Sequence, residues 1–65
     1  MTDYERKMAE LRKLYNADDI DTYETTDDCW VITVYECRAL TFTEYVFDRD
    51  GQYICQSTTV VESAF

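Results

Sequence analysis

The spacing of hydrophobic residues changes once along the chain, near residue 17, and this change most constrains the fold. Before it, four large apolar residues recur at intervals of four and three, which places them on one helix face: Tyr4, Met8, Leu11 and Tyr15. Leu14 lies beside this face, and Thr2 with Glu5 has the pattern of a capping box. The sequence therefore predicts a helix over residues 3–16 whose aromatic face packs against a core.

After this point the apolar residues alternate with polar ones, as they do in strands. The strongest segment is 29–37, where β-branched and aromatic residues dominate. Four strands are predicted: 20–25, 29–37, 40–48 and 52–61. The tetrapeptide from Asp48 to Gly51 is typical of a type I turn followed by a left-handed glycine, so the last two strands form a hairpin. One helix packed on an antiparallel meander of three or four strands is an α+β fold, here a single domain over residues 1–65.

The third predicted strand carries apolar residues on both of its faces. Strict alternation puts one apolar set on the face of Glu44 and another on the opposite face: Leu40, Phe42 and Val46 on the first, Tyr45 and Phe47 on the second. A bulge near Thr43 and Glu44 would restore a single apolar face. Otherwise both faces of the sheet are partly covered, one by the helix and the other by a partner.

Charge is distributed unequally between the two parts of the chain. Residues 1–16 carry four basic and three acidic residues, whereas residues 17–65 carry eleven acidic and two basic residues, for a net charge of −8 overall. Such a chain repels nucleic acid and attracts basic protein surfaces. Eight acids between the helix and the main strand and at the hairpin tip are the predicted partner-binding residues: Asp18, Asp19, Asp21, Glu24, Asp27, Asp28, Asp48 and Asp50.

The composition argues against catalysis, metal binding and a membrane location. The chain has no His and a single Gly, so the usual triads and phosphate loops are absent, and no enzyme activity or cofactor is expected. A calcium loop with Gly51 as its glycine would need a third acidic ligand before Gly51, and Glu where Ser57 stands six residues after it. Three cysteines without paired spacing are expected to be buried reduced thiols: Cys29, Cys37 and Cys55. No apolar run nears the ~20 residues of a membrane span and no signal peptide pattern is present, so a cytoplasmic location is expected.

The size, the charge and two acidic segments carry a resemblance to a known family. With Asp18-Asp19-Ile20-Asp21 and Thr26-Asp27-Asp28 in a small acidic helix-plus-sheet chain, the sequence resembles the phage-encoded anti-CRISPR proteins, specifically type I-C inhibitors that act as DNA mimics. The resemblance implies binding to the large subunit of the surveillance complex, which reads the protospacer-adjacent motif, in the cytosol of an infected bacterium. The eight acids would then stand in for phosphates, and DNA recognition would be blocked without chemistry.

The main alternative is a small acidic protein-interaction module, such as an antitoxin-like or regulatory subunit. Aromatic and apolar residues rather than acids would then make the contact: Tyr35, Tyr45, Tyr53, Phe47 and Val61. The last strand, if it lies at a sheet edge, offers a second route by pairing with a partner strand or with its own copy. The sequence leaves the target subunit and the oligomeric state, monomer or small homo-oligomer, open.

Overall fold

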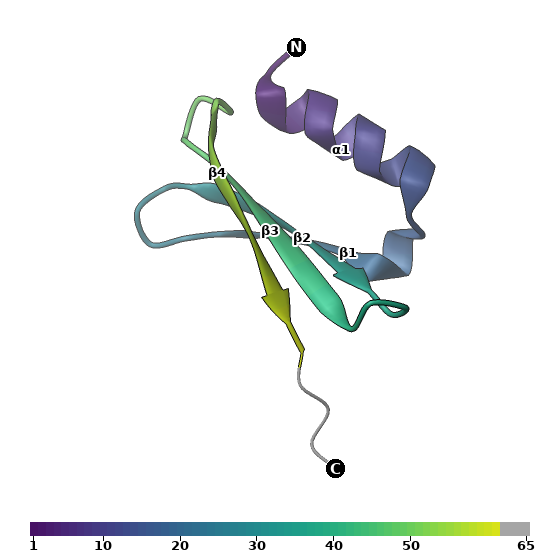
Figure 1. Cartoon of the computed structure of the whole chain (residues 1–65). Helices are drawn as coiled ribbons and strands as arrows, with labels where there is room; N and C mark the ends of the chain where they lie inside the picture. Colours follow the sequence, from purple (N-terminus) through teal and green to yellow (C-terminus); the bar gives the residue numbers. More distant parts are fainter. Residues whose placement is uncertain (62–65) are drawn as a thin grey trace.

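The computed structural model of the protein describes residues 1–61. These residues form one α-helix, a short 3₁₀ helix and a four-stranded sheet in the order β1-β2-β3-β4, with every neighbouring pair antiparallel (Figure 1). The elements are α1 (Asp3–Leu14), η1 (Ala17–Asp19), β1 (Ile20–Glu24), β2 (Trp30–Glu36), β3 (Thr41–Phe47) and β4 (Tyr53–Val60). The predicted α+β meander is confirmed, and the last four residues of the predicted domain lie outside the described part.

The predicted helix is two residues too long, and each strand is shorter than predicted by one or two residues. The helix ends at Leu14 because Tyr15 adopts an extended conformation, while its N–H still donates to the carbonyl oxygen of Leu11 at 2.9 Å. Asn16, also extended, then precedes the 3₁₀ turn that leads directly into β1. The acidic residues that begin the second part of the chain therefore lie in a tight turn rather than in a loose linker.

The start of α1 is held by the predicted capping box and by the β3–β4 hairpin. Thr2 Oγ1 accepts from the N–H of Glu5 at 3.1 Å, and the Glu5 carboxylate accepts from the N–H of Thr2 at 3.0 Å. These hydrogen bonds from Thr2, its backbone first, hold the pKa of Glu5 below its usual value. The N–H of Tyr4 donates to the Gly51 carbonyl at 3.0 Å, and the Asp3 carboxylate accepts from the N–H of Tyr53 at 3.0 Å.

The core lies between α1 and one face of the sheet. Within residues 1–61, Leu11 packs with the buried residues Ile32, Val34 and Phe47. Partly buried apolar side chains surround this cluster: Tyr4, Met8, Tyr15, Ile20 and Tyr45. The predicted helix face is thus confirmed, but Leu14 was wrongly placed beside it. The Leu14 side chain is 68% exposed, because the helix ends there and Tyr15 packs against the core in its place.

The predicted turn between β3 and β4 is confirmed. The N–H of Gly51 donates to the Asp48 carbonyl at 2.9 Å, and the N–H of Asp48 donates to the Gln52 carbonyl at 2.8 Å. Gly51 has φ of +84°, the left-handed region that favours glycine. A Cβ atom at this position would lie 2.7 Å from the Cβ of Thr2, so the hairpin and the helix cap meet at a point where only glycine fits.

The structure decides between the two predicted arrangements of β3. No bulge occurs near Thr43, and Glu44 pairs in register with Thr33 of β2 and Ser57 of β4. The one register shift of the β3–β4 ladder lies at its other end, where Ile54 is the extra residue. Tyr45 and Phe47 therefore point toward α1, and Phe42, Glu44 and Val46 point to the opposite face, which we call the open face.

Candidate partner-binding surface

Six of the eight predicted acids follow one edge of the sheet. β1 is an edge strand, and the acids lie in η1, in β1 itself and in the β1–β2 connection. We call these residues the acidic edge: Asp18, Asp19, Asp21, Glu24, Asp27 and Asp28. All are exposed except Asp19, which is half-buried. The structure thus places these six acids as a strip along an edge strand, which pairs with β2 on one side only.

The hairpin acids lie at one end of this strip and not at the other. In an antiparallel meander the β1–β2 and β3–β4 connections share an end of the sheet, and the ion pair of 3.7 Å between Arg49 Nη2 and Asp28 Oδ2 joins them. Asp50 therefore lies near the Asp28 end. Asp18 lies beyond the other end of β1, a strand about 13 Å long by its rise per residue. The eight acids do not form one compact cluster.

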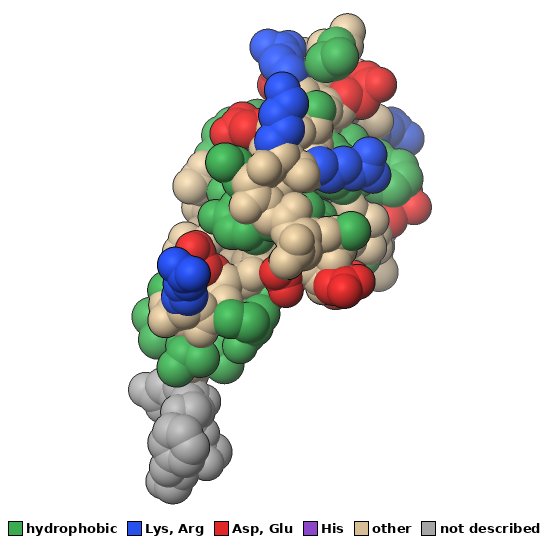
Figure 2. All heavy atoms as spheres, turned by 90° about the vertical axis from the view of Figure 1, so that its right-hand side faces the viewer, with side chains coloured by type: hydrophobic (Ala, Val, Ile, Leu, Met, Phe, Trp, Pro, Cys, Tyr) green, Lys and Arg blue, Asp and Glu red, His purple; other side chains and the backbone are tan. Residues whose placement is uncertain are grey.

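Basic side chains neutralise little of this charge. Of the three ion pairs within residues 1–61, the Arg49–Asp28 pair alone involves a predicted acid, and both of its side chains are largely exposed. The other two pairs lie within α1. Figure 2 looks at the helix side of the molecule and shows Lys and Arg side chains gathered over its upper part. The fold keeps most of its positive charge on α1 and much of its negative charge on the acidic edge.

Asp48 stabilises the hairpin turn, a role that the sequence did not indicate. Its Oδ1 atom accepts hydrogen bonds from the N–H groups of Asp50 and Gln52, both at 2.9 Å. This carboxylate closes the hairpin turn, as Asp side chains do when they bond to the backbone two residues on. Asp50 makes no such contact through its side chain among the described residues and is exposed. The two hairpin acids are therefore not equivalent candidates for partner binding.

The open face carries two apolar rows separated by a polar row. Cross-strand pairing gives the rows Tyr23–Val31–Val46–Cys55, then Asp21–Thr33–Glu44–Ser57, then Tyr35–Phe42–Thr59. Val31 is only 2% exposed although α1 lies on the opposite side. The Tyr23 hydroxyl donates to Glu44 Oε2 at 2.8 Å, reaching from β1 across β2 to β3, and this hydrogen bond raises the pKa of Tyr23.

Two of the residues predicted to bind a partner through aromatic contacts belong to the interior. Phe47 is fully buried under α1, so its assignment to a binding surface is wrong. Tyr45 packs against the same core, and the Lys7 ammonium lies 4.8 Å from the centre of its ring. Tyr35 and Tyr53 are exposed, the first on the open face and the second on the helix side. Alternation placed Tyr45 and Phe47 on one face but did not say which face the helix covers.

The prediction that the three cysteines are buried is also wrong. Cys37 and Cys55 are exposed and Cys29 is half-buried, all as free thiols. Cys37 follows β2 in the turn to β3, and Cys55 lies on the open face of edge strand β4. A small sheet covered on one side has too few interior positions to enclose every apolar residue.

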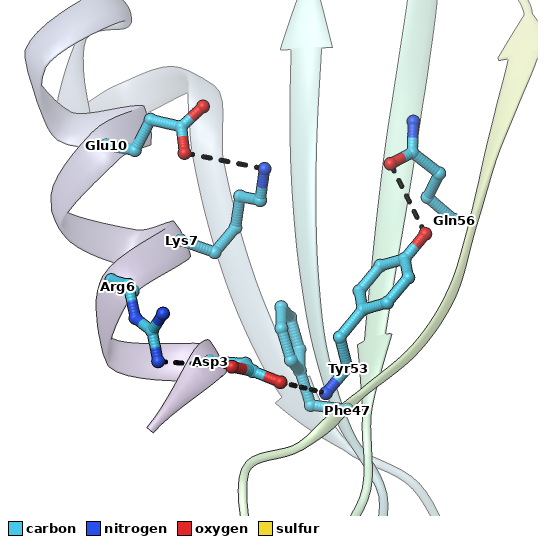
Figure 3. A pocket seen from close by; sticks show the side chains of 7 residues that line it. All are labelled: Asp3, Arg6, Lys7, Glu10, Phe47, Tyr53 and Gln56. Carbon is cyan, nitrogen blue, oxygen red and sulfur yellow. Dashed lines mark hydrogen bonds and ion pairs between the residues drawn. The ribbon is translucent and has the colours of Figure 1, made fainter. Parts of the chain in front are cut away.

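A groove that the sequence did not reveal lies between α1 and the β3–β4 ladder (Figure 3). It measures about 390 Å³ and is lined by Asp3, Arg6, Lys7, Glu10, Phe47, Tyr53 and Gln56. Lys7 pairs with Glu10 at 3.6 Å, and Arg6 pairs with Asp3 at 3.3 Å. Its charged groups are therefore engaged with one another, and the groove shows chiefly that α1 leaves β4 uncovered.

Among residues 1–61, one further titratable group has a shifted pKa. The neighbouring Glu36 carboxylate raises the pKa of Tyr15, whose hydroxyl donates to it at 3.5 Å. Both groups lie near the surface. In the described part of the chain, no three His, Cys, Asp or Glu side chains are grouped so that they could hold a metal ion.

Comparisons with protein families, with curated proteins and with solved structures give no match for this chain. Neither helix within residues 1–61 has the length and apolar character of a membrane span.

Proposed function

We propose that the protein is an anti-CRISPR inhibitor that mimics duplex DNA and blocks target recognition by a type I-C surveillance complex. The observation that carries the proposal is the acidic edge: six carboxylates along an edge strand and its flanking turns, of which Asp28 alone has an ion-pair partner among the described residues. Unpaired, exposed carboxylates remain available to Lys and Arg of another protein. This surface would occupy the basic groove of the subunit that reads the protospacer-adjacent motif.

The charge of the acidic edge corresponds to that of a short stretch of duplex. Duplex DNA carries two phosphates per 3.4 Å of axis, so six to eight charges correspond to roughly three or four base pairs, about 10–14 Å of axis. β1 spans about 13 Å by its rise per residue. Only two of the six acids lie within β1 and four lie beyond its ends, so the acidic edge is longer than this stretch and carries its charge at a lower density than the duplex backbone. It fits a short recognition cleft and not a long channel.

A gel-shift competition tests the proposal. A purified type I-C surveillance complex is incubated with labelled target duplex, with and without a molar excess of this protein, at 0.05 and 0.5 M salt. We expect the shifted band to disappear at low salt and to return at high salt, because about 4 Å Debye screening weakens contacts between exposed charges. An undisturbed band at large excess would show that DNA binding is not the blocked step.

A pair of variants with equal charge change locates the surface. Asp18→Lys with Asp21→Lys reverses two exposed acids of the acidic edge, and Glu10→Lys with Glu36→Lys makes the same change elsewhere. We expect the first pair to weaken inhibition by roughly tenfold or more and the second by less than about threefold, since local complementarity outweighs net charge. Equal losses would indicate that net charge, and not the acidic edge, controls inhibition.

The open face supports a second candidate function, binding to a partner through aromatic contacts. Tyr23 and Tyr35 are exposed there, beside the half-buried Phe42. An interface centred on these residues would tolerate 0.5 M salt, which the DNA mimic would not. Inhibition or partner capture that persists in high salt, and that is lost in Tyr35→Ala, would favour this alternative.

A further inference from the structure

β4 is an edge strand of unusual composition. Its eight residues, Tyr53–Val60, include no charged side chain, and every one of them is exposed. Three of the large hydrophobic side chains exposed on the molecule belong to it: Tyr53 at 46%, Ile54 at 50% and Val60 at 67%. A long, uncharged and uncovered edge is the kind that pairs with another strand.

The outer side of β4 offers backbone groups for such pairing. Val61 donates its N–H to the Leu40 carbonyl, which directs the backbone of Val61 inward, toward β3. In an antiparallel ladder this direction alternates from residue to residue, so Gln56, Thr58 and Val60 direct their N–H and C=O groups outward. α1 leaves this edge uncovered, as the groove beside Tyr53 and Gln56 shows (Figure 3).

We propose that β4 pairs with β4 of a second copy of this chain, antiparallel, to form a symmetric dimer with a continuous eight-stranded sheet. The charge pattern favours this edge over β1 for a second copy. The chain carries a net charge of −8, and β4 is the one strand of the sheet without a carboxylate, so it is where two copies approach with least repulsion. A basic foreign strand would instead be attracted to the acidic edge at β1.

The pairing is self-complementary when the two-fold axis passes through Ser57. Gln56 then lies opposite Thr58 of the second copy, and Cys55 lies opposite Thr59, with matching faces in both cases. These pairs join uncharged polar or small side chains, which favour cross-strand contact. The same arrangement places both helices on one side of the long sheet and both open faces on the other.

The expected dimer is weak. With the axis at Ser57, the seven residues Ile54–Val60 of each copy pair with one another over about 20 Å, and with the molecule's smallest extent of 16 Å the interface buries on the order of 600 Å² in total. Specific interfaces of this size lie at the low end of the observed range, so we expect dissociation at roughly tens to hundreds of micromolar. Dimers would therefore form at high local concentration and would leave monomers at low concentration.

The dimer would also position the two acidic edges. Seven strand spacings of about 4.8 Å separate the β1 strands at the ends of an eight-stranded sheet, or roughly 34 Å. This separation is close to one turn of duplex DNA. Its relevance to DNA mimicry rests on the proposed function, whereas dimerisation itself does not.

Cysteine cross-linking tests the pairing and its register. In a background with Cys29, Cys37 and Cys55 replaced by Ser, Ser57→Cys places two thiols on the axis, at a non-hydrogen-bonded pair with Cα atoms about 4.5 Å apart, within disulfide reach. Thr59→Cys, on the same strand and face, is the matched control, because its copies lie about 14 Å apart along the strands. Under mild oxidation we expect a covalent dimer for Ser57→Cys and not for Thr59→Cys. Equal cross-linking of both, or of neither, would overturn this pairing.

Sedimentation equilibrium between 10 and 500 micromolar tests association without new thiols. We expect Thr58→Lys to raise the dimer dissociation constant roughly tenfold or more, because it places like charges close together across the axis. Thr22→Lys, on the opposite edge strand, should leave it unchanged. Circular dichroism verifies that each variant is folded. A wild-type protein that stays monomeric throughout this range would overturn the proposal, whether or not the protein competes with DNA.

Discussion

The two edge strands of the sheet, β1 and β4, differ in length and in the charge that they expose to solvent. β1 has five residues, two of them acidic, and acids precede and follow it along the chain. β4 has eight residues and no charge, and it ends in the exposed Val60. Both edges leave backbone groups unpaired, yet only β1 carries the charges by which natural sheets discourage strand addition.

The difference shows that one small sheet can use its two edges for two kinds of association, one with a cationic surface and one with another strand. Carboxylates along β1 favour a cationic surface and disfavour a second acidic copy, because like charges repel at short range. An uncharged strand has no such preference, and its affinity for another strand comes from backbone hydrogen bonds and side-chain contact. Changes that alter one edge should therefore leave the other largely intact, provided that the connections between strands hold.

A substitution of Gly51 in the β3–β4 turn, which leads into edge strand β4, is expected to have the largest effect on stability. Gly51→Ala forces a left-handed conformation on a residue with a Cβ and brings that atom against Thr2. We expect a loss of about 2–3 kcal/mol in the free energy of unfolding, measured by urea denaturation. Arg49→Ala in the same turn, with an exposed side chain, is the control and should change stability by less than about 0.5 kcal/mol. A fully stable Gly51→Ala would mean that Thr2 and the turn can move apart.

The two hairpin acids should differ although they remove the same charge. Asp48→Ala deletes the acceptor of two backbone N–H groups and should cost about 1–2 kcal/mol of stability. Asp50→Ala removes an exposed carboxylate and should cost less than about 0.5 kcal/mol. Thermal denaturation of both variants compares them, and equal losses would contradict the structural role of Asp48.

The smallest expected effect concerns the hydrogen bond between Tyr23 of β1 and Glu44 of β3. Glu44 raises the pKa of Tyr23, so the protonated hydroxyl is favoured in the folded state. The resulting stabilisation is fully present below pH 10, the usual tyrosine value, and is lost as the pH rises through the raised pKa. Both groups are near the surface, so the effect is small. Ultraviolet titration should show late ionisation of two tyrosines, Tyr15 and Tyr23; Glu44→Gln should shift one of them to lower pH, and Glu10→Gln should shift neither.

Features that depend on neighbours in sequence were predictable from the residues alone. The capping box needs Thr2 and Glu5 three residues apart, and the turn needs Gly51 after Asp48, so local chemistry specifies both. The helix face of Leu11 follows from the helical period in the same way. The predicted acids along β1 also lie together because they are close in the chain.

Features that depend on which surfaces meet were not predictable in this way. Alternation showed that Tyr45 and Phe47 share a face, but burial of Phe47 depends on the side from which α1 approaches. Exposure of Cys55 depends on β4 being the last strand of an uncovered edge. Asp18 is separated from the hairpin acids because consecutive connections of the meander lie at alternate ends of the sheet. Contacts between residues that are distant in sequence cannot be predicted from the pattern of residues within a short segment.

The sequence by itself determined the order of helix and strands, the cap, the hairpin turn and the concentration of acids after residue 16. These properties arise from backbone preferences and from side chains within a few positions of one another. Tertiary structure alone decided that α1 covers Phe47 and leaves β4 bare, and that β1 and β4 become the two edges. Packing a single helix on four strands buries one face and cannot bury the rest, so the choice of exposed surface is made by the fold as a whole.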